Sequence, residues 1–293
     1  MGGAVVSEPH PPTLVTGNRR AISIAHGPAV QRVMRRCKHR LPIIERQIAA
    51  YWPERTGDHP LLLLFSCVVF SIDDVLDSQP PAPTVAAELA RFLPWQRLDA
   101  SMGADDSRAA LAAVAGELRA RQPSLMDVWQ AEGERTVRAM RREALWRVQG
   151  RRPAFSTYMR VAMHSLGVVW MGLTLAVLGP DHLGRDDLAL FRRKAGRVAR
   201  ACRVLNDLAT WRRERAEGKV NLVQLQSERV GEIDQAVALV EHMYAEARAR
   251  ALAVQRRISV PRLAPAIIGL VRLSQVLEQQ YAQQDYPGPV REV

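Results

Sequence analysis

Cysteine is scarce in this sequence, and the positions of the cysteines exclude two common kinds of site. The 293 residues include Cys37, Cys67 and Cys202, and none of them forms a CxxC pair. Zinc sites and disulfide frameworks need paired or regularly spaced cysteines. The sequence therefore indicates a protein of a reducing compartment, and we expect a cytoplasmic location.

We also expect no secretion signal, because residues 1–6 contain no basic group and the following stretch is rich in proline and polar residues. Residues 161–179 contain no charged group, and this stretch has the length of a candidate membrane span. It carries His164, Ser165, Thr174 and three glycines within a chain of amphipathic helices. We therefore interpret it as a core helix and expect no transmembrane segment.

Strand patterns are nearly absent, whereas helical periods recur throughout. The hydrophobic share of 47% is ordinary for a globular protein and allows a packed core. We predict an all-α fold of about ten helices in one domain, residues 26–286, with a loose arm at 1–25 and a short tail at 287–293. Breaks are expected at Leu41-Pro42, at 79–83, near Gly103, at Pro123, at 150–153 and at 179–184.

Negative charge is in deficit, since 41 basic residues face 30 acidic ones and the formal net charge is +11. An anionic partner is expected, but nucleic acid, lipid headgroups and diphosphate all meet that condition. The arginines are spread over nearly every predicted helix and do not alternate with aromatic residues. This distribution argues against a nucleic-acid partner. A basic helical protein that binds nucleic acid or lipid remains the non-enzymatic alternative.

Three aspartates follow a nearly charge-free stretch at residues 61–72, in the order Asp73-Asp74-Val75-Leu76-Asp77. On a helix, Asp73 and Asp77 fall on the same stripe as apolar residues, so two carboxylates extend an apolar face. The acids could simply cap the helix end, but acids are unfavourable at a helix C-terminus. Carboxylates one turn apart suit hard divalent ions that also hold phosphate oxygens.

A second row of oxygen-bearing side chains lies on the predicted helix that begins near Asp186. Asn206, Thr210 and Glu214 are four residues apart along one edge of its apolar stripe. Each could be an ordinary boundary residue, with Glu214 paired to a neighbouring arginine. Together with the aspartates, however, the row predicts the second wall of a metal-diphosphate site.

The two motifs resemble those of class I terpene synthases, and the short chain is most similar to the bacterial diterpene synthases of ent-kaurene-synthase type. The aspartates resemble the aspartate-rich motif, and the stretch 206–214 resembles the second metal-binding motif. The resemblance implies that Asp73, Asp77, Asn206, Thr210 and Glu214 bind metal, but not Asp207. It also implies an α-helical barrel that binds three Mg²⁺ ions together with the substrate diphosphate.

Further residues are assigned by the same resemblance. Arg160 stands where the family carries an arginine that senses diphosphate, although an exposed arginine is the alternative. Gly167 could mark the helix break that faces the carbocation, or could be a packing glycine. Arg213 occupies the family's basic position and is expected to meet phosphate. The family's C-terminal Arg-Tyr pair corresponds to Asp285 and Tyr286, which leaves Tyr286 as a diphosphate contact.

Aromatic side chains are few, at 5% of the residues, so those near the first acidic motif stand out. Phe70 lies one turn before Asp73 on the same stripe and is expected to face the carbocation. Phe65, Tyr158 and Trp170 are further candidates for that wall, each also explained by core packing.

These features predict a magnesium-dependent enzyme that ionises an isoprenoid diphosphate and cyclises or rearranges the cation. The DxDD motif of class II cyclases is missing, so ionisation is the expected start. A C20 substrate, either geranylgeranyl or copalyl-type diphosphate, is expected, and a separate class II cyclase would supply the latter. A sesquiterpene synthase acting on farnesyl diphosphate and a chain-elongating prenyltransferase are the enzymatic alternatives. A homodimer is compatible with the resemblance.

Overall fold

The computed structural model describes residues 17–77, 106–179 and 183–284. Within these ranges the chain is helical and contains no strand, which confirms the predicted all-α class. The α-helices are α1 (Gly17–Arg36), α2 (Leu41–Tyr51), α3 (His59–Asp77), α5 (Asp106–Arg121), α6 (Met126–Val148), α7 (Phe155–Ser165), α8 (Val168–Leu178), α9 (Arg185–Ala216), α10 (Leu222–Val230), α11 (Ile233–Arg256) and α12 (Ala264–Gln284). Short 3₁₀ turns occur at Thr56–Asp58, Pro123–Leu125 and Pro261–Leu263.

Proline and glycine set most of the helix boundaries. Pro42 lies in the first turn of α2, where its missing N–H is not needed. Pro123 opens the 3₁₀ turn that separates α5 from α6. The predicted breaks at 150–153 and 179–184 are likewise confirmed by the ends of α6 and α8. Those at 79–83 and near Gly103 lie outside the described residues.

The N-terminal arm differs from the prediction. Helix α1 begins at Gly17 and continues through a kink at Gly27, whose φ is +73°. Residues 17–25 are therefore helical and not a loose arm. A glycine with positive φ interrupts the helical backbone there, and the polar composition before it concealed the helix. The rest of the arm lies outside the described residues, as do Tyr286 and the tail.

Helices α3 and α8 form the centre of the core, as their apolar sequences predict. Leu62, Leu64 and Phe65 of α3 and Trp170 of α8 are almost fully buried. Two stretches, 56–74 and 155–178, are long and apolar enough to cross a membrane. However, 61% and 72% of the most apolar segment of each stretch are buried inside the protein. Interior packing therefore accounts for their apolar character.

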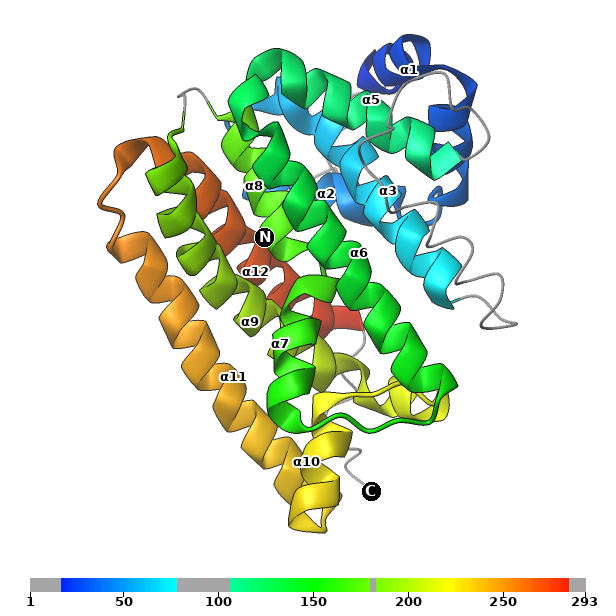
Figure 1. Ribbon diagram of the computed structural model, residues 1–293, viewed down its shortest axis with the longest axis vertical. Coiled ribbons are helices and arrows are strands. Elements are labelled where there is room, and N and C mark those ends of the chain that lie inside the picture. The colour runs from blue at the N-terminus through cyan, green and yellow to red at the C-terminus, as the bar shows by residue number, and fades with distance from the viewer. Residues whose placement is uncertain (1–16, 78–105, 180–182, 285–293) are drawn as a thin grey trace, which may run out of the picture.

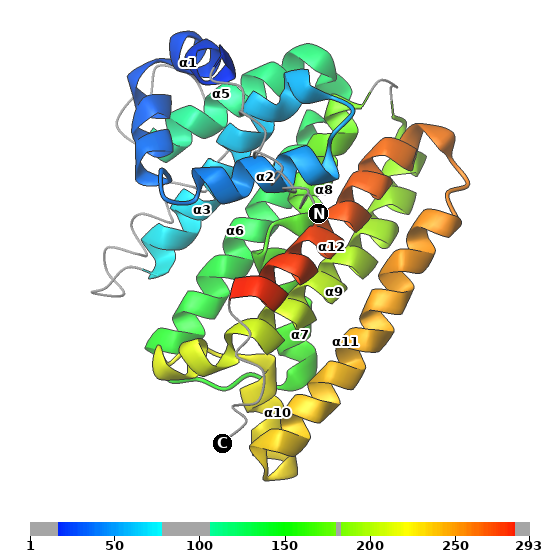
Figure 2. The same cartoon turned by 180° about the vertical axis from the view of Figure 1, so that it is seen from behind.

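The C-terminal halves of α3 and α9 line a common space that has α6 on one side and α12 on the other. Figure 1 shows α6, α7, α9 and α11 on one face of the molecule. Figure 2 shows α12 on the opposite face, between α2 and α9, and contacts link α12 to α2, α8 and α9. Because the ends of α3 and α9 approach each other within this frame, the two predicted oxygen rows can share one site.

Candidate functional site

Two adjoining chambers lie between α3 and α9, the first toward α6 and the second toward α12. The first has a volume of about 400 Å³ and is lined mainly by charged side chains. The second, of about 330 Å³, is lined mainly by apolar side chains of α2, α3, α8 and α12. Asp73, Asn206 and Arg213 line both chambers, together with Arg40 and Leu166. A charged chamber therefore opens onto an apolar one at the two predicted motifs.

The aspartates of α3 have different surroundings. Asp73 is partly buried and lines both chambers, whereas Asp74 is exposed and lines only the charged chamber. The guanidinium of Arg40 donates to both carboxylate oxygens of Asp74, at 2.8 and 3.0 Å. Asp77 is the last residue of α3, and its side chain lies outside the described part of the structure. The predicted distinction between Asp73 and Asp74 thus has a geometric basis.

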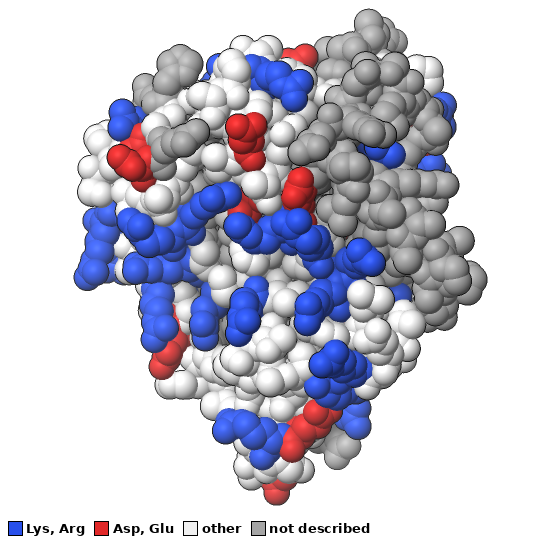
Figure 3. All heavy atoms as spheres, in the orientation of Figure 1, with Lys and Arg blue, Asp and Glu red and all other residues white. Residues whose placement is uncertain are grey.

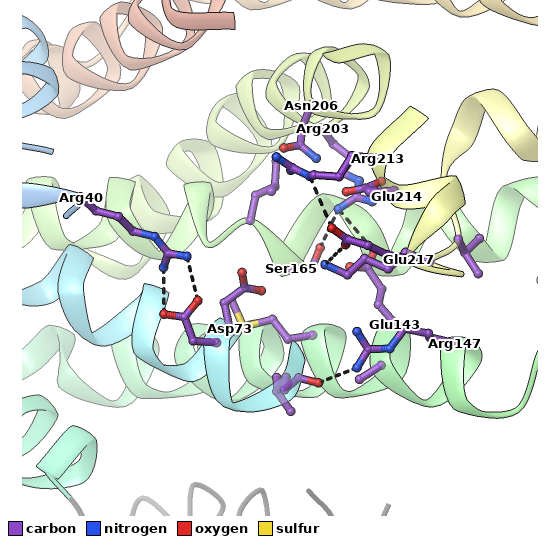
Figure 4. Close-up of a pocket in the computed structure, with 17 residues that line it drawn as sticks. Arg40, Asp73, Glu143, Arg147, Ser165, Arg203, Asn206, Arg213, Glu214 and Glu217 are labelled. Atoms are coloured by element: carbon purple, nitrogen blue, oxygen red, sulfur yellow. Dashed lines mark hydrogen bonds and ion pairs between the residues drawn. The ribbon is translucent and has the colours of Figure 1, made fainter. Parts of the chain in front are cut away.

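Helix α9 supplies the opposite wall. Asn206 and Glu214 line the charged chamber, and Figure 4 shows them with Arg213 across the chamber from Asp73. Glu214 accepts a hydrogen bond from Nδ2 of Asn221 at 2.7 Å, which fixes the carboxylate. Thr210 is buried, does not itself line the chamber, and donates from Oγ1 to the backbone carbonyl of Asn206 at 2.7 Å. A metal-binding role for each of the three remains a prediction.

Asp207 points away from the chambers and into the protein interior. It pairs with Arg203 at 2.9 Å and accepts hydrogen bonds from the hydroxyl of Tyr158 and the amide of Asn221. Burial raises the pKa of Asp207 to about 7, opposed by the lowering effect of Arg203. This cluster joins α7, α9 and the start of α10 and holds the backbone beside Asn206 in place. Tyr158 consequently belongs to the interior and not to the predicted cation-facing wall.

Basic side chains from four parts of the chain border the charged chamber. Arg213, predicted to meet phosphate, is among them. Sequence reasoning missed the others: Arg40, Arg147, Arg203 and Lys219. Arg203 lies three residues before Asn206, and that spacing on one helix face was the available signal. Arg40 and Arg147 come from segments far from either motif, so no spacing in the sequence indicated them.

Arg160 does not line either chamber, contrary to the prediction. It is exposed on α7, whose buried face carries Tyr158, Ala162 and Ser165. At about 100° per residue, Arg160 lies on the opposite side of the helix from Tyr158. The resemblance places Arg160 on α7, which does border the charged chamber through Ser165, but Arg160 lies on the solvent-facing side of that helix.

A tyrosine near the end of the last described helix contacts the second motif. Tyr281 of α12 lines the apolar chamber, and its hydroxyl donates to Oδ1 of Asn206 at 2.7 Å. Burial raises the pKa of Tyr281 to about 12, so the hydroxyl stays protonated and can donate. The predicted contact, Tyr286, lies outside the described residues. Sequence reasoning missed Tyr281 because nothing near it in the sequence points to Asn206.

Phe70 lines the apolar chamber directly beneath Asp73, as its helical position predicts. The guanidinium of Arg40 lies over its ring, 4.9 Å from the centroid. Phe65 lines the same chamber, whereas Trp170 packs beneath Phe65 with a centroid separation of 4.9 Å and does not line it. Gly167, between α7 and α8, has a φ of +68° and also lines the chamber. The predicted helix break is therefore confirmed.

The donor set fits magnesium held jointly with a phosphate-bearing ligand. Among the described residues, no group of three or more acidic, histidine or cysteine side chains forms a complete metal site. Magnesium is usually bound through one or two carboxylates while substrate phosphates supply further oxygens. Asp73 and Glu214, on facing helices, match that arrangement. The neighbouring basic groups can bind the same phosphates from the other side.

The fold and the two facing helices define a class I terpene synthase architecture. Abietadiene synthase from Abies grandis matches with a TM-score of 0.71 and 18% identity over 90% of this chain and 40% of that protein. Linalool/nerolidol synthase from Streptomyces clavuligerus, in complex with 2-fluorogeranyl diphosphate, matches with a TM-score of 0.69 and 16% identity over 88% of this chain and 94% of that one. Isoprene synthase from grey poplar leaves (Populus x canescens), solved with three Mg²⁺ ions and dimethylallyl-S-thiolodiphosphate, matches with a TM-score of 0.66 and 17% identity over 86% of this chain.

The chain belongs to terpene synthase family 2. Residues 65–250, which include both motifs, match the family described as "Terpene synthase family 2, C-terminal metal binding". The chain spans 40% of the length of abietadiene synthase and 54% of that of the poplar enzyme. At these low identities the solved structures establish the fold alone. No curated protein matches the sequence.

Proposed function

We propose that the protein is a magnesium-dependent diterpene synthase of ent-kaurene-synthase type, acting on geranylgeranyl or copalyl-type diphosphate. One observation carries the proposal: a chamber of facing acidic and basic side chains opens directly onto an apolar chamber, with Asp73 and Asn206 at the junction. An amphiphile with a diphosphate head and a hydrocarbon tail has the same division of character. Buried and unpaired cysteines further support a cytoplasmic location.

The charged chamber would orient the diphosphate. Arg213 and Lys219 can neutralise phosphate oxygens, while Asp73, Glu214 and Asn206 would hold magnesium, with Thr210 supporting the backbone beside them. Bound magnesium would supply charge neutralisation of the departing diphosphate. Asn221 holds the Glu214 carboxylate in its orientation through the bond at 2.7 Å. The amide oxygen of Asn206 accepts from Tyr281 and keeps a second lone pair that can bind a metal.

The apolar chamber would exclude water from the carbocation and fold the hydrocarbon chain. Phe70 and Phe65 present aromatic side chains to this space, and an aromatic face attracts a cation. Met171 and Leu277 line it with further apolar side chains. A copalyl-type substrate would be supplied by a separate class II cyclase. Farnesyl diphosphate, the substrate of a sesquiterpene synthase, is the alternative that the same chambers could accept.

Incubation of the purified protein with each candidate substrate tests the proposal. Farnesyl, geranylgeranyl and copalyl diphosphates are supplied separately with magnesium, and extracts are analysed by mass spectrometry. We expect hydrocarbon or alcohol products of 20 carbons from a C20 substrate and no product with a chelator. Asp73→Asn should abolish the product, and the exposed Arg160→Ala serves as the matched control. Products from farnesyl diphosphate alone would overturn the diterpene assignment, and elongated diphosphates would indicate a prenyltransferase.

A further inference from the structure

A second basic feature lies on the surface, away from both chambers. An open groove between α9 and α11, with a volume of about 840 Å³, shares no lining residue with either chamber. Its walls carry six arginines: Arg192, Arg193, Arg197, Arg200, Arg250 and Arg257. We call this feature the arginine groove. Figure 3 shows that lysine and arginine side chains gather in a band across the face formed by α6, α7, α9 and α11.

The charge of the arginine groove is only partly compensated by the protein. Arg250 pairs with Glu246 at 3.0 Å, and Arg192 lies 3.6 Å from Glu132. Among residues that the structure describes, Arg193, Arg197 and Arg200 form no ion pair with an acidic side chain. Guanidinium groups held close together repel one another unless an anion neutralises them. The groove therefore presents a site for an external anion.

The spacing of the arginines favours an extended anion. The arginines of α9 run from residue 192 to 200, a distance of about 12 Å at 1.5 Å per residue. A guanidinium can bind phosphate through two parallel N–H bonds, so one phosphate engages only a few of the six. A surface with repeated phosphates can engage the whole row. The expected partner is therefore a polyanionic surface and not a single small anion.

The floor of the arginine groove distinguishes between polyanions. Small and apolar residues form it: Met163, Gly196, Ala247, Ala249 and Ala253. None of the lining residues is aromatic, although stacking on aromatic side chains is a main source of affinity for single-stranded nucleic acids. We propose that this face docks on an anionic lipid surface, with phosphate headgroups at the arginines. Docking would place an enzyme with an apolar chamber beside a phase that dissolves hydrocarbon products.

Vesicle binding tests the inference without any substrate. The full chain is mixed with vesicles of phosphatidylcholine alone or of phosphatidylcholine and phosphatidylglycerol in equal amounts, and the bound fraction is measured by flotation. We expect binding only to the anionic vesicles and weakening as salt rises, because screening shortens the range of the interaction. Each lost arginine weakens binding by roughly fivefold. The triple variant Arg193→Gln, Arg197→Gln, Arg200→Gln should therefore bind about a hundredfold more weakly.

The control variant removes the same charge elsewhere. Arg35, Arg46 and Arg119 are exposed on α1, α2 and α5 and lie outside the groove. Their triple replacement by Gln should lower binding by less than about threefold, since charges beyond a Debye length contribute little. Replacing Arg193, Arg197 and Arg200 by Lys keeps the charge and should preserve vesicle binding. That variant also keeps the test valid if the Gln variant does not fold.

Several outcomes would overturn the inference. Equal losses in the groove and control variants would show that net charge alone drives binding. Loss of vesicle binding in the Lys variant would indicate a site for a single phosphate. The same conclusion would follow if inorganic diphosphate displaced the protein from vesicles at a concentration near the dissociation constant of diphosphate for the protein. Tighter binding to a single-stranded oligonucleotide than to the anionic vesicles at the same salt would identify nucleic acid as the partner.

Discussion

The neighbouring carboxylates Asp73 and Asp74 show how much one position on a helix changes a residue's role. Asp73 lines both chambers, while Asp74 is exposed, lines only the charged chamber and is held by Arg40 through two bonds. We expect Asp73→Asn to lower diphosphate release by at least about a hundredfold, because a metal-binding oxygen is lost at the junction, worth several kcal/mol. Asp74→Asn should lower it by less than about tenfold. Measured release rates that fall equally would contradict this difference.

Arg213 and Arg160 form a second informative pair, since both were predicted to bind diphosphate. Arg213 lines both chambers, whereas Arg160 is exposed on the outer side of α7. Arg213→Ala should weaken the binding of inorganic diphosphate, with magnesium present, by about tenfold or more, because charge-assisted bonds contribute roughly 1.5–3 kcal/mol. Arg160→Ala should leave it unchanged. Isothermal calorimetry measures both, and a larger loss in the Arg160 variant would reverse the assignment.

Phe70 offers a test at the junction of the chambers. Arg40 already lies over its ring at 4.9 Å, so the ring faces a position suited to positive charge. Phe70→Leu keeps most of the apolar volume but removes a cation–π contact of about 2 kcal/mol. Since about 1.4 kcal/mol is a factor of ten in rate, the product ratio should shift more than tenfold while diphosphate release continues. A lower melting temperature with unchanged products would instead show that Phe70 only packs the core.

The sequence predicted these residues to different extents, for a physical reason. Asp73, Asn206 and Glu214 lie on helix stripes whose period is visible in the sequence, and the structure brings their helices together. Arg40 and Tyr281 come from opposite ends of the described chain. Their contacts with Asp74 and Asn206 depend on how helices pack, which no local period records. Local periodicity therefore predicts a wall of a site but not the residues that close it.

At the scale of elements, the junction of α7 and α8 requires a glycine, because the backbone there is left-handed. Gly167 lies between α7 and α8 and has a φ of +68°. A Cβ at this position would lie 3.4 Å from Cγ1 of Val69. A left-handed conformation costs about 1–2 kcal/mol for a residue with a side chain. Gly167→Ala should therefore lower the melting temperature by several degrees. It should also alter products, because the junction lines the apolar chamber.

Gly116 provides the matched control. It lies within α5, and a Cβ at this position meets no atom within 4 Å. Gly116→Ala should raise the melting temperature slightly, because alanine stabilises a helix interior by up to about 1 kcal/mol relative to glycine. Calorimetric melting curves of the two variants should thus move in opposite directions. Destabilisation of both would indicate that the φ at Gly167 is not the cause.

Helix positions were more predictable than the arrangement of the helices. The apolar stretches that became α3 and α8 are evident from their composition, and proline marks the starts of several elements. Residues 17–25 are helical although the sequence predicts a loose arm, because the kink at Gly27 and the polar composition obscure the helix. The arginines of α9 and α11 look dispersed along the sequence but gather on one groove when the helices pack side by side. Surface clusters of this kind follow from packing, and sequence order does not reveal them.

On the scale of the whole molecule, the charged chamber links segments from the start of α2 to beyond the end of α9. Asp73 and Glu214 face each other across it, while Arg213 and Lys219 lie nearby. Magnesium without diphosphate would meet the repulsion of the arginines, and diphosphate without magnesium would meet that of the carboxylates. The two ligands should therefore bind together, and each should bind weakly alone. Because this binding requires the folded arrangement of distant helices, it should stabilise the entire domain.

A ligand present at about one hundred times its dissociation constant stabilises a folded protein by about 2.7 kcal/mol. For a domain of this size that corresponds to a rise in melting temperature of roughly 5–10 °C. Magnesium and inorganic diphosphate together should produce this rise in a calorimetric scan, while either alone should raise the temperature by less than about 2 °C. Glu214→Ala should remove the joint effect. Among the described residues of α9, Glu214 is the only acidic side chain that lines the charged chamber, and Asn221 holds its carboxylate in place. An equal rise with diphosphate alone would mean that the basic side chains suffice and that the two oxygen rows do not form a metal site.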